Sequence, residues 1–191
     1  MSQLILASAS PRRSELLTQI NIAHRIQVAD IDETPYKNES PQDYVVRVAQ
    51  EKARKVQQTV NDSSVILAAD TSVVLADQIM GKPKDLPDAL AMLSALSGTR
   101  HEVYSAVAVF GREEKTRLCV SHVVFRKLSE QEIIHYWHTG EPIGKAGAYA
   151  IQGLASIFIE SIQGSYSGIM GLPLFETAQL LADEGIKVFN D

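Results

Sequence analysis

A short loop near the N-terminus, residues 8–13, carries the side chains best suited to holding an anion. The apolar run 4–7 has the length of a strand, and after Pro11 apolar residues recur at helical spacing, so the loop joins a strand to a helix. Ser10 suits the N-cap of that helix, and Pro11 suits its first position. Free N–H groups at the helix start would meet four polar side chains there, those of Ser8, Ser10, Arg12 and Arg13. The loop is expected either to hold a polyanion such as a phosphate chain or to be an ordinary capped helix with two solvated arginines.

Three of the four residues at 30–33 are acidic, and they follow a short strand expected at 24–29: Asp30, Asp32 and Glu33. Carboxylate oxygens suit a hard divalent cation, although a solvated turn has the same composition. The pattern Asp-x-Asp-x-Thr also matches the opening motif of haloacid-dehalogenase-type phosphatases, in which the first Asp is the nucleophile. Their later Gly-Asp-Gly-x-x-Asn-Asp type of motif has no counterpart here, so a covalent phosphatase using Asp30 is kept as a competing hypothesis.

A further carboxylate, Asp70, ends the apolar run 65–69. Many α/β proteins place functional groups at the carboxyl ends of their strands, so Asp70 is a candidate for chemistry; the alternative is a carboxylate that caps a turn. Lys52 falls beside the apolar stripe of a helix expected at 41–60, where its ammonium either snorkels to solvent or points into a shared pocket. Lys82 stands between a glycine and a proline in a rigid turn.

A glycine-rich loop at 141–153 contains Gln152, and its composition suits close approach of the backbone to a ligand. His135 and His138 are three residues apart on an expected helix, but no third metal ligand is near them in sequence, so they are interpreted as ordinary surface or lid residues. The serines of the loop 164–168 do not have Gly-x-Ser-x-Gly spacing, which leaves a hydrolase nucleophile elbow unsupported.

The elements that must position these groups follow from hydrophobic periodicity and from capping sequences, which begin helices at Ser40 and Ser129. Further helices are expected at 87–96, at 130–140 and from 173 onward. Further strands are expected at 73–75, 79–80, 101–110, 116–125 and 154–160, with a candidate edge strand at 186–189. The two long strands are joined by a short charged turn and predict an antiparallel hairpin.

The whole chain has the composition of a globular domain. Its 191 residues are 45% hydrophobic and 21% charged, which indicates neither disorder nor a membrane protein. No apolar run approaches a bilayer span and no secretory signal is recognisable, so one cytoplasmic domain of two lobes, residues 1–191, is expected. The single cysteine, Cys119, excludes an internal disulfide framework and a multi-cysteine zinc site. A net charge of −5 argues against a general nucleic-acid surface and favours a small anionic ligand.

Taken together, the motifs resemble the Maf family of nucleotide pyrophosphatases over essentially the full length of the chain. The matching segments are Ala7-Ser8-Ala9-Ser10-Pro11-Arg12-Arg13, Asp32-Glu33, Glu51-Lys52-Ala53, Ala69-Asp70-Thr71, Gly81-Lys82-Pro83, Lys145-Ala146-Gly147-Ala148-Tyr149, Ile151-Gln152-Gly153 and Gly171-Leu172-Pro173. The resemblance implies an elongated, two-lobed α/β fold with a mixed sheet flanked by helices, similar to inosine triphosphate pyrophosphatase. It also implies a divalent metal cation (Mg²⁺ or Mn²⁺), hydrolysis of nucleoside triphosphates to monophosphate and pyrophosphate, and a homodimer.

The same resemblance implies roles for individual residues. Asp70 would be the proton acceptor, with Glu33 beside it as a metal ligand or water-positioning group, so that these two carboxylates hold the metal. Contacts to the phosphates would come from Ser8, Arg13, Lys52 and Lys82. Base selection would come from Arg12, Thr71 and Gln152, a combination similar to the branch acting on dTTP and UTP. Gly144 and Ala150 depart from the more usual Asp and Gly, which leaves the lid contacts open.

Two other functions stay open. A nucleotide-binding regulator of cell division would need the phosphate loop but not Glu33 and Asp70, so the presence of both carboxylates favours an enzyme. A phosphomonoesterase using Asp30 would release inorganic phosphate instead of pyrophosphate. In a pyrophosphatase, cations must neutralise the phosphates and a base must orient the attacking water, because negative charge gathers at the α-phosphorus.

Overall fold

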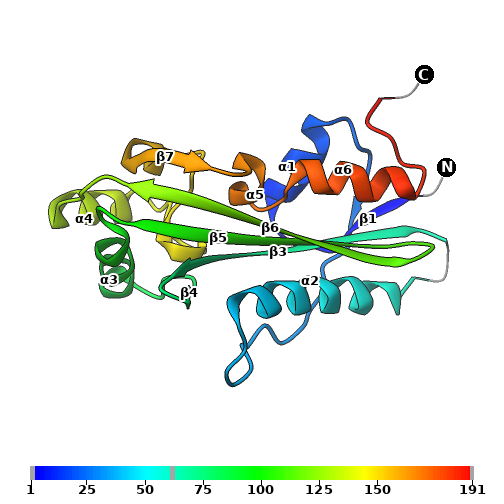
Figure 1. Ribbon diagram of the computed structural model, residues 1–191, viewed down its shortest axis with the longest axis horizontal. Helices are drawn as coiled ribbons and strands as arrows, with labels where there is room; N and C mark the ends of the chain where they lie inside the picture. Colours follow the sequence, from blue (N-terminus) through cyan, green and yellow to red (C-terminus); the bar gives the residue numbers. More distant parts are fainter. Residues whose placement is uncertain (1–2, 61–62, 190–191) are drawn as a thin grey trace.

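The structure, a computed structural model, describes residues 3–60 and 63–189. Within these residues one mixed sheet has seven strands in the order β2-β1-β3-β5-β6-β7, with β4 paired to β3 off this path (Figure 1). The strands are β1 (Leu4–Leu6), β2 (Arg25–Ile26), β3 (Val65–Leu75), β4 (Gln78–Met80), β5 (Arg100–Phe110), β6 (Glu114–Phe125) and β7 (Ile159–Gln163). β1 runs parallel to β2 and β3, and the other pairings are antiparallel. The mixed α/β sheet and the long hairpin are therefore confirmed.

Helices cover both faces of this sheet. They are α1 (Pro11–Gln19), α2 (Pro41–Gln57), α3 (Leu86–Leu96), α4 (Glu130–His138), α5 (Tyr166–Met170) and α6 (Leu174–Asp183), with 3₁₀ segments η1 (Ala146–Ala148) and η2 (Leu154–Phe158). Figure 1 shows an elongated molecule with α2 along one side of the sheet, α1, α5 and α6 along the other, and α3 with α4 at one end. None of the described helices combines the length and the apolar character that a membrane span requires.

The first half of β3 is buried because apolar side chains pack on both of its faces. Its even-numbered residues from Ile66 to Ala68 belong to the cluster against α2, and its odd-numbered residues from Val65 to Ala69 belong to the cluster against α1 and α6. A third cluster joins α3, α4 and η2 at the other end of the sheet. Along β3, the polar residues Asp70, Thr71 and Ser72 lie between Ala69, which packs in the cluster against α1 and α6, and Val73, which packs in the third cluster.

Helix α2 begins as its capping sequence predicts. The Ser40 hydroxyl accepts a hydrogen bond from the backbone N–H of Asp43. The helix ends at Gln57, three residues before the predicted end, because the Thr59 hydroxyl bonds to the carbonyl of Val56 at 2.7 Å and satisfies one of the last free carbonyls.

Three strand predictions differ from the structure. The run 65–69 and the predicted strand 73–75 form one continuous strand, β3, so Asp70 lies in the middle of a strand and not at its carboxyl end. The segment 24–29 forms a strand only at β2, which has two residues. The predicted strand 154–160 is wrong: most of this segment is the 3₁₀ helix η2, and β7 begins after it. The carboxylate of Glu141 accepts hydrogen bonds from the backbone N–H groups of Leu154 and Ala155, which holds the backbone in a turn at this point.

The C-terminal region differs in two further places. The predicted loop 164–168 contains the start of the short helix α5. The candidate edge strand 186–189 is absent from the described residues, because the N–H of Ile186 bonds back to the carbonyl of Leu181 at 2.9 Å. Gly185, at φ 80°, makes that reversal possible, since glycine adopts this conformation without strain.

Candidate active site

A cleft opens beside the middle of β3. β1 pairs with residues 65–67 of β3 and β4 pairs with residues 73–75, while β5 pairs with the opposite edge along nearly the whole strand. Among the described residues, the stretch with Asp70 and Thr71 therefore lacks a neighbouring strand on this edge. A cavity of about 830 Å³ lies there, a size that suits a small-molecule ligand.

Every site residue predicted from the sequence lines this cleft. The residues come from separate segments that only the fold brings together: α1, α2, β3, and the loops before α1, before α2, after β4 and after η1. They are Ser8, Arg12, Arg13, Glu33, Lys52, Asp70, Thr71, Lys82 and Gln152. Their shared location is observed, whereas their individual chemical roles stay predictions.

Lys52 lies between the two carboxylates of the site. Its Nζ is 2.8 Å from Oε1 of Glu33 and 2.9 Å from Oδ1 of Asp70. Lys52 and Asp70 are each 7% exposed, whereas the Glu33 side chain is 43% exposed. The lysine therefore points into the cleft instead of snorkelling to solvent, and one ammonium faces two carboxylates.

Positive charge around Glu33 keeps its side chain ionised. Burial raises the pKa of Glu33, but the hydrogen bond from Lys52 and the charges of Lys52, Lys82 and Arg13 outweigh burial, so this pKa lies below its ordinary value of 4.5. Burial lowers the pKa of Arg13 from its ordinary 12.5, and the charges of Asp70 and Glu33 oppose that change. The site thus combines fixed negative and positive groups at neutral pH.

The loop before α1 is organised by Ser8 and Arg13. The Ser8 hydroxyl oxygen accepts hydrogen bonds from Nη1 of Arg13 at 2.9 Å and from the backbone N–H of Ser10 at 3.2 Å. Arg13 also donates from Nε to the carbonyl of Gly171 at 2.8 Å, which ties the loop to the chain before α6. Ser10 occupies the N-cap position, as predicted, and its side chain makes no capping hydrogen bond. The N–H groups at the start of α1 are therefore not engaged by that hydroxyl, which suits an anionic ligand.

Two predicted specificity residues, Arg12 and Gln152, line the cleft together with Gly144 and Ala150. Arg12 pairs with Glu15 at 2.9 Å and its side chain is 43% exposed, so it is accessible to a ligand. Gln152 lines the cleft from the loop that follows η1, together with Gly144 and Ala150. Gly144 has φ 73°, a conformation that glycine adopts without strain.

Two tyrosines that line the cleft, Tyr44 and Tyr149, are not among the site residues predicted from the sequence. The Tyr44 hydroxyl donates to the backbone carbonyl of Glu33 at 2.9 Å and ties the acidic loop to α2, and burial raises the pKa of Tyr44 to about 12. The Tyr149 hydroxyl lies 2.9 Å from Nε2 of His101, whose pKa burial lowers to about 4, so that the ring is neutral. Tyr44 could have been found from its place four residues before Val48 on the buried face of α2. Tyr149 and His101 are 48 residues apart, and no local pattern joins them.

Among the described residues that line the cleft, the carboxylates are Glu15, which is paired with Arg12, and Glu33 and Asp70, which share Lys52. No group of three or more His, Cys, Asp or Glu side chains among residues 3–60 and 63–189 could hold a metal ion. Mg²⁺ commonly takes one or two protein carboxylates and completes its shell with phosphate oxygens and water. Glu33 and Asp70 are therefore the two residues that could hold a divalent cation together with a phosphate ligand.

The residues of the competing hypotheses lie elsewhere. Asp30, the nucleophile of the phosphatase hypothesis, is exposed and is not among the residues that line the cleft. Its neighbour Asp32 accepts a hydrogen bond from the N–H of Thr34 at 2.9 Å, as in an ordinary turn. His135 and His138 are exposed on α4 and also lie outside the cleft, as expected.

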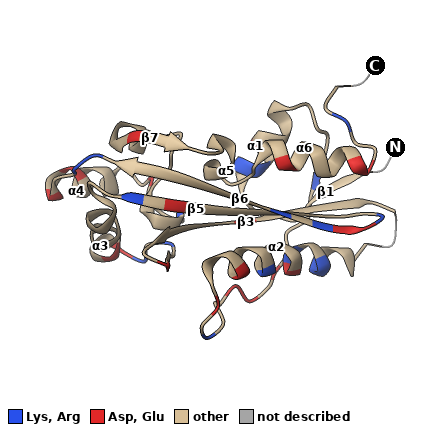
Figure 2. Ribbon diagram, in the orientation of Figure 1, with Lys and Arg blue, Asp and Glu red and all other residues tan. Residues whose placement is uncertain are grey.

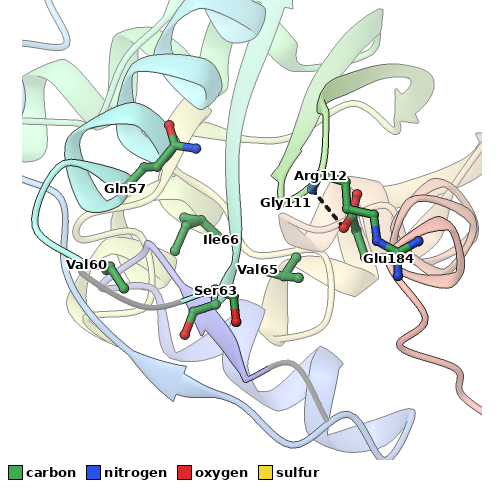
Figure 3. Close-up of a pocket in the computed structure, with 9 residues that line it drawn as sticks. Gln57, Val60, Ser63, Val65, Ile66, Gly111, Arg112 and Glu184 are labelled. Carbon is green, nitrogen blue, oxygen red and sulfur yellow. Dashed lines mark hydrogen bonds between the residues drawn. The ribbon is translucent and has the colours of Figure 1, made fainter.

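A second cavity, of about 340 Å³, lies between the C-terminal end of α2 and the turn that joins β5 to β6 (Figure 3). Its buried carboxylate, Glu184, accepts a hydrogen bond from the backbone N–H of Arg112 at 3.0 Å. None of the site residues predicted from the sequence lines this cavity. The candidate chemistry is therefore confined to the larger cleft.

Opposite charges alternate along the outer side of α2. Figure 2 shows blue and red segments interspersed on this helix. Arg47 pairs with Glu39 and Glu51, and Arg54 pairs with Glu114 of the β5–β6 hairpin. These arginines are engaged within the protein, which agrees with a small anionic ligand in the cleft and not a nucleic-acid polymer on this surface.

Comparison with known proteins establishes the family. Residues 3–184 match the family described as Maf-like protein. The chain belongs to the Maf family. This Maf chain is 51% identical to a protein named dTTP/UTP pyrophosphatase from Hahella chejuensis (strain KCTC 2396), over 99% of this chain and 96% of that protein. It is 48% identical to a protein of the same name from Myxococcus xanthus (strain DK1622), over 97% of this chain and 94% of that protein. The resemblance stated from the sequence motifs is confirmed.

Solved structures resemble the Maf chain more distantly. The structure of the Staphylococcus aureus Ham1 protein aligns with a TM-score of 0.47 and 13% identity, over 68% of this chain and 73% of that chain. A nucleoside-triphosphatase, or dITP/XTP pyrophosphatase, from Mycobacterium abscessus aligns with a TM-score of 0.41 and 15% identity, over 66% of this chain and 75% of that chain. Similarity at this level makes no statement about the chemistry of the Maf chain.

Proposed function

We propose that this Maf protein hydrolyses dTTP and UTP, or modified forms of these nucleotides, to the nucleoside monophosphate and pyrophosphate. The observation that carries the proposal is the ion-paired group Glu33–Lys52–Asp70, which shares one cleft with Ser8 and Arg13 of the loop and helix start at α1. Relatives between 48% and 51% identical over nearly the whole chain bear the name dTTP/UTP pyrophosphatase. A nucleotide-binding regulator without catalysis would have no need of the two carboxylates.

The phosphate chain would lie at the start of α1. The N–H groups of the helix start, Arg13 and Lys82 supply positive charge there. Attack on the α-phosphorus moves negative charge onto the leaving pyrophosphate, so cations fixed at this place stabilise the transition state more than the bound substrate. Because Ser8 and Gly171 already orient Arg13, little reorganisation is needed when the phosphates bind.

Asp70 would accept a proton from the attacking water, and Glu33 would help to orient that water. Lys52 holds both carboxylates in place through contacts of 2.8 and 2.9 Å, which makes it a positioning group as well as a candidate phosphate contact. Mg²⁺ or Mn²⁺, held by Glu33 and Asp70 together with phosphate oxygens, would when bound neutralise charge on the substrate.

Base selection would depend on Gln152, Arg12 and Thr71. The amide of Gln152 carries both a donor and an acceptor, so it can pair with the alternating carbonyl and N–H edge of thymine or uracil. A base with the wrong edge would leave polar groups unpaired in the cleft, at a cost of about 1–3 kcal/mol for each group. Discrimination of roughly ten- to a hundredfold would follow from one such mismatch.

A product assay over a nucleotide panel tests the proposal. Purified protein with Mg²⁺ or Mn²⁺ is given dTTP, UTP, CTP, ATP, GTP and methylated GTP, and pyrophosphate and inorganic phosphate are measured separately. We expect pyrophosphate alone, with dTTP and UTP ahead of the others in kcat/KM. Release of inorganic phosphate would favour the phosphomonoesterase, and binding without turnover would favour the regulator.

We further propose that the protein acts as a cytoplasmic homodimer, as the family resemblance implies. Sedimentation velocity measures the mass directly, and a mass of one chain at micromolar concentration would contradict the dimer. Cell fractionation with an antibody to the protein tests the compartment.

A further inference from the structure

The short helix α5 forms part of the wall of the cleft. Its residues Ile169 and Met170 line the cleft next to Gly171. A helix of five residues has few hydrogen bonds of its own, so contacts from the neighbouring strands must fix its position.

Ser105 contacts the middle of α5 from the sheet. It lies in β5 directly opposite Thr71 of β3 and is 1% exposed. Its Oγ donates to the carbonyl of Gly168 at 2.6 Å and lies 3.0 Å from Oγ1 of Thr71. Oγ1 of Thr71 is also 3.4 Å from the carbonyl of Gly171, to which Arg13 donates at 2.8 Å.

These contacts determine the direction of the Thr71 hydroxyl proton. A hydroxyl has one proton to donate, and Ser105 gives its proton to Gly168 in the shorter bond. Ser105 therefore accepts in its contact with Thr71. The Thr71 hydroxyl donates its proton to Ser105 or to the carbonyl of Gly171, so in both cases the proton is engaged by a protein acceptor. Toward the cleft, the Thr71 hydroxyl can only accept a hydrogen bond.

We propose that Ser105 is a positioning residue for base selection, acting through Thr71 and α5 without touching the substrate. This inference rests on the proposed pyrimidine specificity. Thymine and uracil carry an N–H donor at N3, whereas cytosine has an acceptor there, so an acceptor-only hydroxyl at Thr71 favours the first two and disfavours CTP. Ser105 also sets how far Ile169 and Met170 extend into the cleft.

Ser121 provides a matched control. It is a serine of β6 that is also 1% exposed, and it contacts Ser165, the N-cap residue of α5. Its Oγ accepts from the N–H of Ser165 at 2.9 Å and lies 3.4 Å from the carbonyl of the same residue. Neither Ser121 nor Ser165 lines the cleft. Loss of the Ser121 hydroxyl should destabilise the same helix without freeing Thr71.

The test compares Ser105→Ala with Ser121→Ala by kcat/KM for dTTP, UTP and CTP. We expect Ser105→Ala to lower the ratio of kcat/KM for dTTP to kcat/KM for CTP by about tenfold. The change should come from a lower KM and a higher kcat/KM for CTP, while kcat for dTTP stays nearly unchanged. Ser121→Ala should lower the melting temperature by about as much as Ser105→Ala does, and it should keep the preference for dTTP over CTP. In the Thr71→Val background, Ser105→Ala should cause no further loss of preference, because the two hydroxyls act as one unit.

An unchanged preference in Ser105→Ala, an equal loss in Ser121→Ala, or full additivity with Thr71→Val would overturn the role of Ser105. The proposed function has a separate test in the unmodified protein. If that protein releases no pyrophosphate or prefers CTP, the proposed function fails; if it prefers dTTP and Ser105→Ala keeps that preference, only the role of Ser105 fails.

Discussion

Replacing Lys52 by Met removes the ammonium between Glu33 and Asp70 and keeps most of the buried stem. The two carboxylate oxygens that Nζ bridges lie at most about 6 Å apart. At an effective dielectric constant of ~20, two like charges at that distance repel by about 3 kcal/mol. Because Glu33 is partly exposed, solvent screens part of this repulsion. We expect the free energy of unfolding to fall by about 2–3 kcal/mol at pH 7, and the melting temperature by about 5–10 °C.

The loss should depend on pH in a defined direction. The folded protein holds the pKa of Glu33 below its ordinary value of 4.5, so this group stabilises the fold at pH values above 4.5 and loses that effect as pH falls through the lowered pKa. In Lys52→Met the pKa of Glu33 rises, and protonation relieves the repulsion. The stability difference between the two proteins should therefore be largest near pH 7 and shrink below pH 4.5.

Urea unfolding at pH 7 and at pH 4 measures both effects. Lys55→Met is the control, because Lys55 lies on the same helix but is exposed, and this change should alter stability by less than about 0.5 kcal/mol. Turnover of dTTP should fall by roughly one to three orders of magnitude in Lys52→Met. A variant as stable as the unmodified protein at pH 7, or a loss of the same size at both pH values, would refute the electrostatic account of this site.

Three further substitutions test the roles of individual residues. Asp70→Asn should abolish dTTP turnover while the melting temperature stays within a few degrees, since the side chain keeps its shape but loses its basicity; near-normal turnover would remove Asp70 from the role of base. Asp30→Asn should leave kcat/KM nearly unchanged, because Asp30 is exposed and outside the cleft, and a trapped phospho-enzyme that this change abolishes would instead support the phosphatase. Gln152→Glu should reduce the preference for dTTP over GTP by about tenfold, measured as a ratio of kcat/KM, and an unchanged ratio would exclude Gln152 from base recognition.

Local chemistry explains which parts of the fold could be predicted. The capping sequences at Ser40 and Ser129 determine where α2 and α4 begin, and the structure shows both capping hydrogen bonds. The β5–β6 hairpin follows from two long apolar runs around a charged turn. The segment 154–160 could not be predicted in this way, because its turn depends on the carboxylate of Glu141, more than ten residues away.

The residues of the candidate site also divide into those that could be predicted from the sequence and those that depend on contacts between distant segments. Site residues such as Lys52 and Asp70 were predicted from their residue types and from the resemblance, and all of the predicted site residues line the cleft. The sequence left open whether Lys52 snorkels, because that depends on Glu33 and Asp70 reaching it from two other segments. Ser105 was missed because a serine in the middle of a strand has no distinctive pattern, and its importance comes from contacts 34 and 63 residues away.

Hydrolysis of dTTP in water enriched in ¹⁸O tests the central claim most directly. If water attacks the α-phosphorus with Asp70 as base, the products are dTMP and pyrophosphate, and one ¹⁸O atom appears in dTMP by mass spectrometry. Asp70→Asn should show neither product above the background rate. Label in pyrophosphate, or release of labelled inorganic phosphate, would show attack at a different phosphorus and would contradict the account.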